Sequence, residues 1–309
     1  MRISTSWANQ SSVNAMLDQQ SRLQQTQMQI STGKKILTPS DDPVAAAHII
    51  DLNQTLKQTE QYQSNINYAR DRLTMEEGVL QGATDILQRI YELGIQGLSD
   101  TNTPTSRNAA AVEMESLNKQ LVNLANTKNA NGEYMFSGFK SNTQPFSKDA
   151  SNPGAYVYSG DVNTRPIQID AVSQVADGDP GSSVFGIPTG ASPATVPLPG
   201  AIANVFEAID KFATDLRANA PTKASLDDIS KSLDKIVTVR ASVGTRLNVL
   251  DRQETINSDA ILNTRTILSN TEDLDYAEAI TKLTQQSASV QAAQQTFAQV
   301  KKLSLFNYL

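Results

Sequence analysis

The 309-residue chain has no cysteine, one histidine and one tryptophan. Without cysteine there is no disulfide, no thiolate nucleophile and no cysteine-ligated metal. Aromatic residues make up 6% of the chain and hydrophobic residues 39%. This composition is lean for a chain of such length and favours elongated helical packing over one large globular core. No run of residues approaches the ~18 consecutive apolar positions that a membrane-spanning helix requires.

The charge balance is acidic, with a formal net charge of −6 and a sequence pI near 4.9. There is no basic surplus to neutralise phosphates, so nucleic acid and anionic membranes are poor candidate partners. The first seven residues turn polar at once and contain no apolar stretch of the kind that a cleaved secretory signal has. We therefore expect either a cytosolic protein or one exported without a cleaved signal peptide.

What the chain does contain is a long series of heptad patterns. Between residues 8 and 32 Met16, Leu23 and Ile30 lie seven residues apart, but Gln20 and Gln27 occupy the alternate seam positions. So polar a seam makes a weak coiled coil, and we expect this segment to become ordered only beside partners.

A longer and more apolar run follows, and it predicts one helix over residues 43–98. Six positions keep a strict seven-residue interval: Leu52, Thr59, Ile66, Leu73, Leu80 and Leu87. The stretch 102–106 contains proline and breaks this pattern, and a 4-3-4-3 stripe over residues 110–124 then predicts a second amphipathic helix.

Short aromatic or β-branched segments at 133–139, 155–158 and 165–169, bounded by turn residues, predict strands. Helical periodicity returns over residues 205–216 and 226–268. It keeps the seven-residue interval near the end of the chain at Tyr276, Leu283, Val290 and Phe297. The simplest way to bury both long seams is to pack the N-terminal and C-terminal helices against each other.

The predicted fold is therefore mainly α with a small β insert. We expect a long antiparallel coiled-coil rod built from the N-terminal and C-terminal segments, with the β-rich domain inserted at its distal end. The predicted segments are an N-terminal assembly helix (1–42), the first half of the rod (43–131), the β-rich outer insert (132–200), the second half of the rod (201–274) and a C-terminal assembly helix (275–309).

The stretch from residue 30 to residue 43 carries a Gly-Lys pair and paired carboxylates, but it does not predict a phosphate loop. That motif needs glycine where the chain has Met28, and serine or threonine where it has Lys35. A helix stop and a helix start account for the residues better. Gly33 suits the left-handed position after a helix end, and Lys34 and Lys35 suit the carbonyl terminus. Ser40, Asp41 or Asp42 can cap the next helix, and if Asp42 is the cap, Pro43 falls at its first position.

Other candidate chemistry is weak. His48 is the lone histidine, and a metal would need further ligands from distant segments. No G-x-S-x-G elbow is present, and nothing selects a catalytic pair of carboxylates. Asp273 is either the cap of a last helix or part of a docking segment. We therefore predict a non-enzymatic protein with no catalytic, cofactor or metal residues.

Two segments are similar to those of a known family. Residues 31–47 (Ser-Thr-Gly-Lys-Lys-Ile-Leu-Thr-Pro-Ser-Asp-Asp-Pro-Val-Ala-Ala-Ala) resemble the helix-loop-helix signature of the flagellin superfamily, and residues 273–277 (Asp-Leu-Asp-Tyr-Ala) resemble its C-terminal Asp-x-Asp-Tyr-Ala segment. The start at 1–6, the segment 132–139 followed by Pro145-Phe146, and the ending at 303–309 are most similar to the hook–filament junction proteins of that superfamily.

This resemblance implies a structural subunit of the bacterial flagellum, exported through the flagellar type III channel. Such subunits form a junction ring that joins hook to filament and templates flagellin assembly. The implied partners are other copies of the chain, the hook-proximal junction protein, flagellin, and a cytoplasmic export chaperone at the C-terminal helix. The suspected contact residues are Met16, Leu23, Ile30, Asp41, Asp42, Pro43, Asp275, Tyr276, Leu283, Val290, Phe297, Leu305, Phe306 and Leu309.

Two other functions stay open at this point. The chain could be the filament subunit, which polymerises without limit, whereas a junction ring stops after a limited number of copies. It could also be a secreted coiled-coil binding or effector protein with an activity in residues 147–222, where the sequence offers no convergent polar group.

Overall fold

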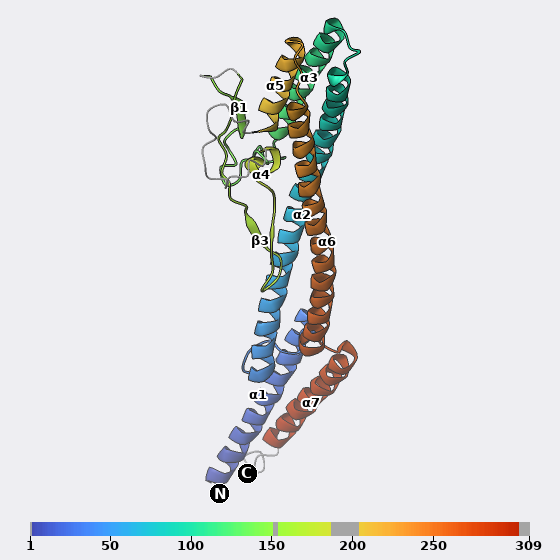
Figure 1. Cartoon of the computed structure of the whole chain (residues 1–309). Coiled ribbons are helices and arrows are strands. Elements are labelled where there is room, and N and C mark those ends of the chain that lie inside the picture. Colours follow the sequence, from blue (N-terminus) through green and yellow to red (C-terminus); the bar gives the residue numbers. More distant parts are fainter. Residues whose placement is uncertain (1, 151–153, 187–203, 303–309) are drawn as a thin grey trace. The chain divides into compact units, whose positions relative to one another are not determined.

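A computed structural model describes residues 2–150, 154–186 and 204–302. The chain forms helices α1 (Arg2–Thr32), α2 (Pro43–Leu98), α3 (Pro104–Ala125), α4 (Gly181–Phe185), α5 (Val205–Arg217), α6 (Lys223–Glu272) and α7 (Tyr276–Lys302), and strands β1 (Phe146–Lys148), β2 (Tyr156–Tyr158), β3 (Pro166–Gln168) and β4 (Gln174–Ala176) (Figure 1). The predicted class, mainly α with a small β insert, is confirmed. None of the described helices is long and apolar enough to cross a membrane.

The chain divides into two compact units. The first, the terminal unit, contains residues 1–59 and 259–309. The second, the central unit, contains residues 60–258. The five segments drawn from the sequence divide the chain more finely than these units, and they stay a prediction.

Helix α2 begins at Pro43 and ends at Leu98, as the heptad pattern predicted. Within the central unit its seam residues Ile66, Leu73, Leu80 and Leu87 are completely buried. Apolar residues spaced seven positions apart lie on one face of a helix. This stripe therefore forms the buried face of α2 along most of its length within the central unit.

Helices α2 and α6 run antiparallel within the central unit. Arg70 of α2 donates a hydrogen bond of 3.0 Å to Asp251, and Arg240 of α6 donates two, of 3.1 and 2.7 Å, to Oε1 of Glu77. Further along α2, a Cβ added to Gly94 would lie 2.7 Å from Leu226. As the residue numbers increase along α2, the residue numbers of their contacts on α6 decrease, which is the pattern of two antiparallel helices.

Helices α3 and α5 lie side by side in the same unit (Figure 1). The amide of Asn118, which is buried on α3, donates to the Phe206 carbonyl at 3.0 Å and to Asp210 Oδ1 at 2.6 Å. The glycines of α2 let α5 approach closely, because a Cβ on Gly97 would lie 2.4 Å from Leu216. The end of α2 is thus covered by helices.

The insert contains two separate antiparallel hairpins. β1 pairs with β2 so that Phe146 faces Tyr158, and β3 pairs with β4 so that Pro166 faces Ala176. The sequence predicted β2 and β3, but it missed β1 and β4, which are three residues long. The predicted strand at 133–139 is wrong: this segment is a series of turns with one isolated bridge between Lys128 and Tyr134.

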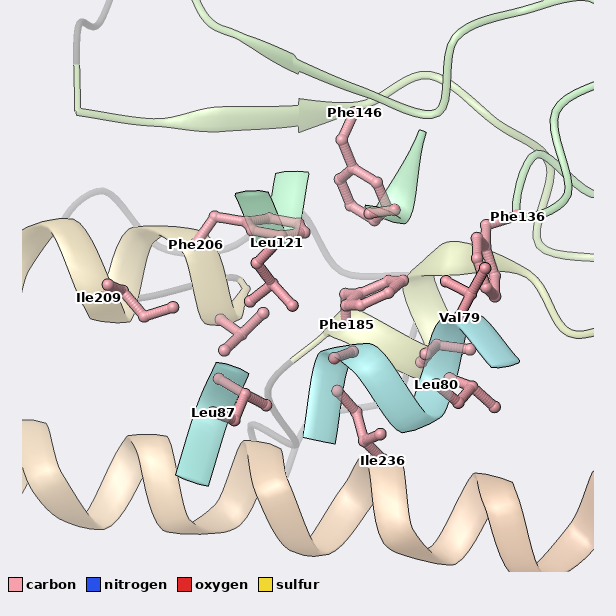
Figure 2. Packing of buried hydrophobic residues seen from close by; sticks show 14 of the residues in the cluster. Val79, Leu80, Leu87, Leu121, Phe136, Phe146, Phe185, Phe206, Ile209 and Ile236 are labelled. Atoms are coloured by element: carbon pink, nitrogen blue, oxygen red, sulfur yellow. The ribbon is translucent and has the colours of Figure 1, made fainter. Parts of the chain in front are cut away.

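Aromatic packing attaches the insert to the helices (Figure 2). Phe146 of β1 lies edge-on to Phe206 of α5 with ring centroids 4.9 Å apart, and edge-on to Phe185 of α4 at 5.6 Å. Phe136 packs edge-on against Phe185 at 5.3 Å. In Figure 2 this cluster lies over Val79 and Leu80 of α2, so the insert shares one core with the helices.

The insert lies along the sides of α2 and α6, and the expectation that it sits at their far end is corrected. Asn65 of α2 and Asn257 of α6 donate to the carbonyls of Gln168 and Ile169 beside β3, at 2.8 and 3.2 Å. The ends of these helices carry turns, where Arg107 bonds to Asn219. The physical reason is that polar side chains on the helix flanks bind the backbone of the insert.

Candidate assembly site

The first part of the site is the end of α1. Gly33 has a positive φ of 72°, and its N–H donates to the Gln29 carbonyl at 2.9 Å. This is the left-handed helix stop that the sequence predicted. The carbonyl of the same glycine accepts a hydrogen bond of 2.9 Å from the N–H of Leu274. The stop of α1 is therefore also the place where the segment before α7 is attached.

The two lysines after Gly33 bind α6. Lys34 forms an antiparallel bridge with Asp273 and an ion pair with Glu272. The N–H of Lys35 donates to the Glu272 carbonyl at 2.8 Å, and its ammonium donates to the Asn270 carbonyl at 2.9 Å. The sequence predicted that these cations stabilise a helix C-terminus. For Lys35 that terminus is the end of α6, where Asn270 lies 235 positions away from Lys35 in the chain.

The two aspartates before α2 have different roles. Oδ2 of Asp41 accepts from the N–H groups of Leu37 and Thr38 at 3.0 and 2.9 Å, and Oδ1 accepts from the Gln25 amide at 2.9 Å. These backbone donors hold the pKa of Asp41 below its ordinary value, because they stabilise the charged form.

Asp42 is the cap of α2. Its Oδ1 accepts from the N–H groups of Val44 and Ala45 at 3.1 and 2.9 Å, and Pro43 occupies the first position of the helix. The predicted pairing of an aspartate cap with a proline that has no N–H to satisfy is confirmed.

Helix α7 is capped by Asp275. Its Oδ1 accepts from Ala277 and Glu278 at 2.9 and 3.2 Å. The cap that the sequence offered, Asp273, instead pairs with Lys34 and accepts a hydrogen bond from the Ser269 hydroxyl. The next residue, Tyr276, is half exposed, and its hydroxyl lies 3.0 Å from where a Cβ on Gly33 would be. Asp275 and Tyr276 are thus placed beside the loop that joins α1 to α2.

Helices α1 and α7 pack against each other in the terminal unit. The bridge between Lys34 and Asp273 joins the end of one helix to the start of the other, so the two helices run antiparallel. The six heptad residues predicted on them are shielded: Met16, Leu23, Ile30, Leu283 and Phe297 are half-buried and Val290 is buried. The predicted contact residues Leu305, Phe306 and Leu309 lie outside the described residues.

The terminal unit has little core of its own. Among its residues whose burial is described, only Thr26, Ala279 and Val290 are buried. Large hydrophobic side chains of the same unit lie exposed: Trp7, Leu17, Met28, Val44, Ile50, Leu262, Ile267, Tyr276 and Ile280. Scattered exposed apolar residues are ordinary, but a unit with far more exposed than buried ones is typical of a surface that binds another chain.

An open groove of about 1100 Å³ runs beside these loops. Gln25 and Gln29 of α1 line it, together with Asp41, Asp42 and Asp275. Lys35 and Lys282 are its basic residues, and Asp273 and Glu278 add further carboxylates. Polar side chains on the groove walls are suited to hydrogen bonding with a protein surface.

Sequence reasoning missed a second polar cluster, in the central unit. It joins Arg72 and Glu76 of α2, Arg246 of α6, and Asp177 and Asp179 of the loop after β4. Glu76 lies beside the heptad line of α2, at a position where the pattern leads one to expect an apolar residue. This departure from the pattern is the signal that could have marked the cluster. Its partners could not be read from the sequence because they lie about 100 or more positions away.

The profile of the bacterial flagellin N-terminal helical region matches residues 3–141. The flagellar hook-associated protein 3 of Escherichia coli K12 is 31% identical over 99% of both chains. A flagellin of Clostridium tyrobutyricum is 30% identical, but over 36% of this chain and 29% of its own. The crystal structure of the flagellar junction protein FlgL from Legionella pneumophila has a similar fold, with a TM-score of 0.59 at 24% identity over 73% of this chain and 99% of its own.

Proposed function

Because the chain belongs to the flagellar hook-associated protein 3 family, we propose that it joins the hook to the filament as a junction ring and templates flagellin assembly. The chain is a structural subunit of the bacterial flagellum, as the resemblance of residues 31–47 and 273–277 implied. The observation that carries the proposal is the terminal unit, which exposes more large hydrophobic side chains than it buries.

Such a unit gains its core by binding neighbours. Burying apolar surface contributes roughly 25 cal/mol per Å², and the exposed side chains of α1 and α7 offer that surface to adjacent subunits. Leu17 and Met28 are 11 residues apart, close to three helical turns, so they share one side of α1. Because binding stabilises only the folded form of this unit, assembly and ordering of the unit are coupled.

The loops of the site hold α1 and α7 as one surface. Lys34, Lys35 and Leu274 connect the two loops through backbone hydrogen bonds of 2.8 and 2.9 Å. Fixing both helices before association lowers the entropy lost on binding. In the proposed ring, Met16, Leu23, Ile30, Leu283, Val290 and Phe297 hold the helix pair together, and the exposed residues contact the next subunit.

The proposed partners are other copies of the chain, the hook-proximal junction protein and flagellin. We also propose an export chaperone on the C-terminal helix, where Leu305, Phe306 and Leu309 would belong to its contact, and export without a cleaved signal peptide. The support for these finer assignments is the family.

A filament subunit is the weaker alternative. The flagellin of Clostridium tyrobutyricum aligns with 36% of this chain, whereas the hook-associated protein 3 of Escherichia coli K12 aligns with 99% of it. A secreted binding or effector protein would need a ligand site in residues 147–222, and the described part of this segment is used to attach the insert to α2, α5 and α6.

The proposal is tested by deleting the gene in its host. Intact hooks without filaments, with flagellin monomers in the medium, are the expected result. Missing filaments with no flagellin in the medium would identify the filament subunit, and normal motile filaments would contradict both functions.

Complementation of the deletion strain with variants then tests whether the exposed side of α1 contacts the next subunit. A Leu17→Asp, Met28→Asp variant should be exported but should not restore filaments, because two charges would be buried at the contact between subunits. The matched control is Val172→Asp on the insert, an 89% exposed hydrophobic residue, which should restore filaments. Full restoration by the α1 variant would remove this face of α1 from the assembly contact.

A further inference from the structure

The buried cluster between the insert and the helices has an unequal number of charges. Three arginines, Arg72, Arg165 and Arg246, meet four carboxylates, Glu76, Glu133, Asp177 and Asp179. Arg72 pairs with Glu133 at 3.1 Å and with Asp177 at 3.2 Å, and Arg165 also pairs with Asp177. Arg246 pairs with Asp179. One carboxyl group is left over.

That carboxyl group is Glu76, which is 1% exposed. Its Oε1 accepts a hydrogen bond of 3.2 Å from the N–H of Asp179, whereas its Oε2 is buried and has no hydrogen-bond partner. A buried charge without an ion pair costs several kcal/mol. The group avoids this cost by holding its proton.

We infer that Glu76 is a neutral carboxylic acid that latches the loop 177–181 onto α2 and α6, and that its ionisation releases the insert from the helices. This device is independent of the ring-forming function proposed above, because it lies in the central unit. The loop is the right element to respond, since it also carries Asp177 and Asp179 and leads directly into α4 and its Phe185.

The charged groups that act directly on Glu76 are Arg72 on α2, Arg246 on α6 and Asp179 after β4. Glu133 after α3, Arg165 before β3 and Asp177 after β4 join the same cluster through their ion pairs. Glu77 is occupied by Arg240 at 2.7 Å. Desolvation, and then the nearby charge of Asp179, raise the pKa of Glu76 to about 8.

The direction of the effect follows from proton linkage. Between the ordinary glutamate pKa of 4.5 and about 8, the folded chain holds a proton on Glu76 that the unfolded chain has lost. Stability contributed by this group therefore falls as the pH rises through that window. The insert is therefore held more firmly at pH 5 than at pH 8, and ionised Glu76 favours its release.

Limited chymotrypsin digestion of the full chain tests the latch, because Phe185, buried in α4 just beyond the loop 177–181, is a cleavage site only when the loop opens. Cleavage after Phe185 is followed by mass spectrometry for the wild type and for Glu76→Gln, which keeps a neutral side chain of the same shape. Comparison at one pH removes the pH dependence of the protease. We expect the wild type to be cleaved faster than Glu76→Gln, and this excess to grow by roughly ten- to thirtyfold from pH 6.5 to pH 9, because the opened chain loses a proton that the closed chain holds up to about pH 8.

The matched control is Glu77→Gln, the next residue of α2, which should keep the wild-type rise in cleavage at pH 9. Equal cleavage of wild type and Glu76→Gln at both pH values would overturn the latch. A second measurement does not depend on any variant: carboxyl ¹³C NMR of the wild type should show Glu76 titrating near pH 8. A Glu76 resonance that titrates at or below pH 4.5 would overturn the inference.

Discussion

The backbone of Lys34 pairs with that of Asp273 in an antiparallel bridge, and this pairing fixes the register in which α1 and α7 meet. The bridge is extended on both sides, by Lys35 binding the Glu272 carbonyl and by Leu274 binding the Gly33 carbonyl. Both segments that resemble the flagellin superfamily are therefore parts of one structural device. In the proposed ring, this device sets the surface that the subunit offers to its neighbours.

A side chain at Gly33 should weaken the attachment of α7 to the end of α1. Its φ of 72° costs an alanine about 1 kcal/mol, and the added Cβ would lie 3.0 Å from the Tyr276 hydroxyl. Gly33→Ala should make amide exchange at the start of α7 roughly fivefold faster. The matched control is Gly78→Ala, whose Cβ would have no neighbour within 4 Å and which removes a glycine from a helix interior. Equal effects of the two variants would contradict this role of Gly33.

Phe206 should be a main support of the insert. It is completely buried and contacts the rings of Phe146, Tyr156 and Phe185. Phe206→Ala should lower the free energy of unfolding by about 3–5 kcal/mol, measured by chemical denaturation. Phe139, 55% exposed, is the control, and Phe139→Ala should change that free energy by less than about 0.5 kcal/mol. A small effect at Phe206 would show that the insert is not packed as described.

Asp41 should make the loop before α2 sensitive to acid. Its folded pKa lies below the ordinary value of 3.8, so its stabilising contribution is present above that value and is lost as the pH falls through the folded pKa. Amide exchange at Leu37 and Thr38, compared with Asp41→Asn at the same pH, should show protection in the wild type at pH 6. This difference should shrink below pH 4. A constant difference across the range would exclude a charged Asp41 as the cause.

In the isolated chain, α1 and α7 should exchange amide hydrogens faster than the central part of α2. Thr26, Ala279 and Val290 are the buried side chains described in the terminal unit, whereas α2 buries a continuous stripe from Ile66 to Leu93. Local opening costs less where fewer apolar contacts must be broken. Mass-spectrometric amide exchange in dilute solution measures this directly. Protection of α1 and α7 equal to that of α2 would mean that the terminal unit is stable without neighbours.

The sequence by itself determined the long helices, the stop of α1 and the start of α2. The heptad line from Leu52 to Leu87 predicted the bounds of α2, and Gly33, Asp42 and Pro43 have the roles that their local chemistry demands. These signals act within a few residues of the chain, so they can be read before any tertiary contact is known. The same reasoning failed for Asp273, because a local capping rule cannot anticipate a partner such as Lys34.

The tertiary structure alone decided which distant residues meet. It placed Lys35 on the last carbonyls of α6, laid the insert along the flanks of α2 and α6, and left Glu76 without an ion pair among three arginines. Each of these features joins segments from about 100 to more than 200 positions apart. Short-range periodicity carries no information on such pairs, because their energies arise only when packing excludes water from the groups that meet.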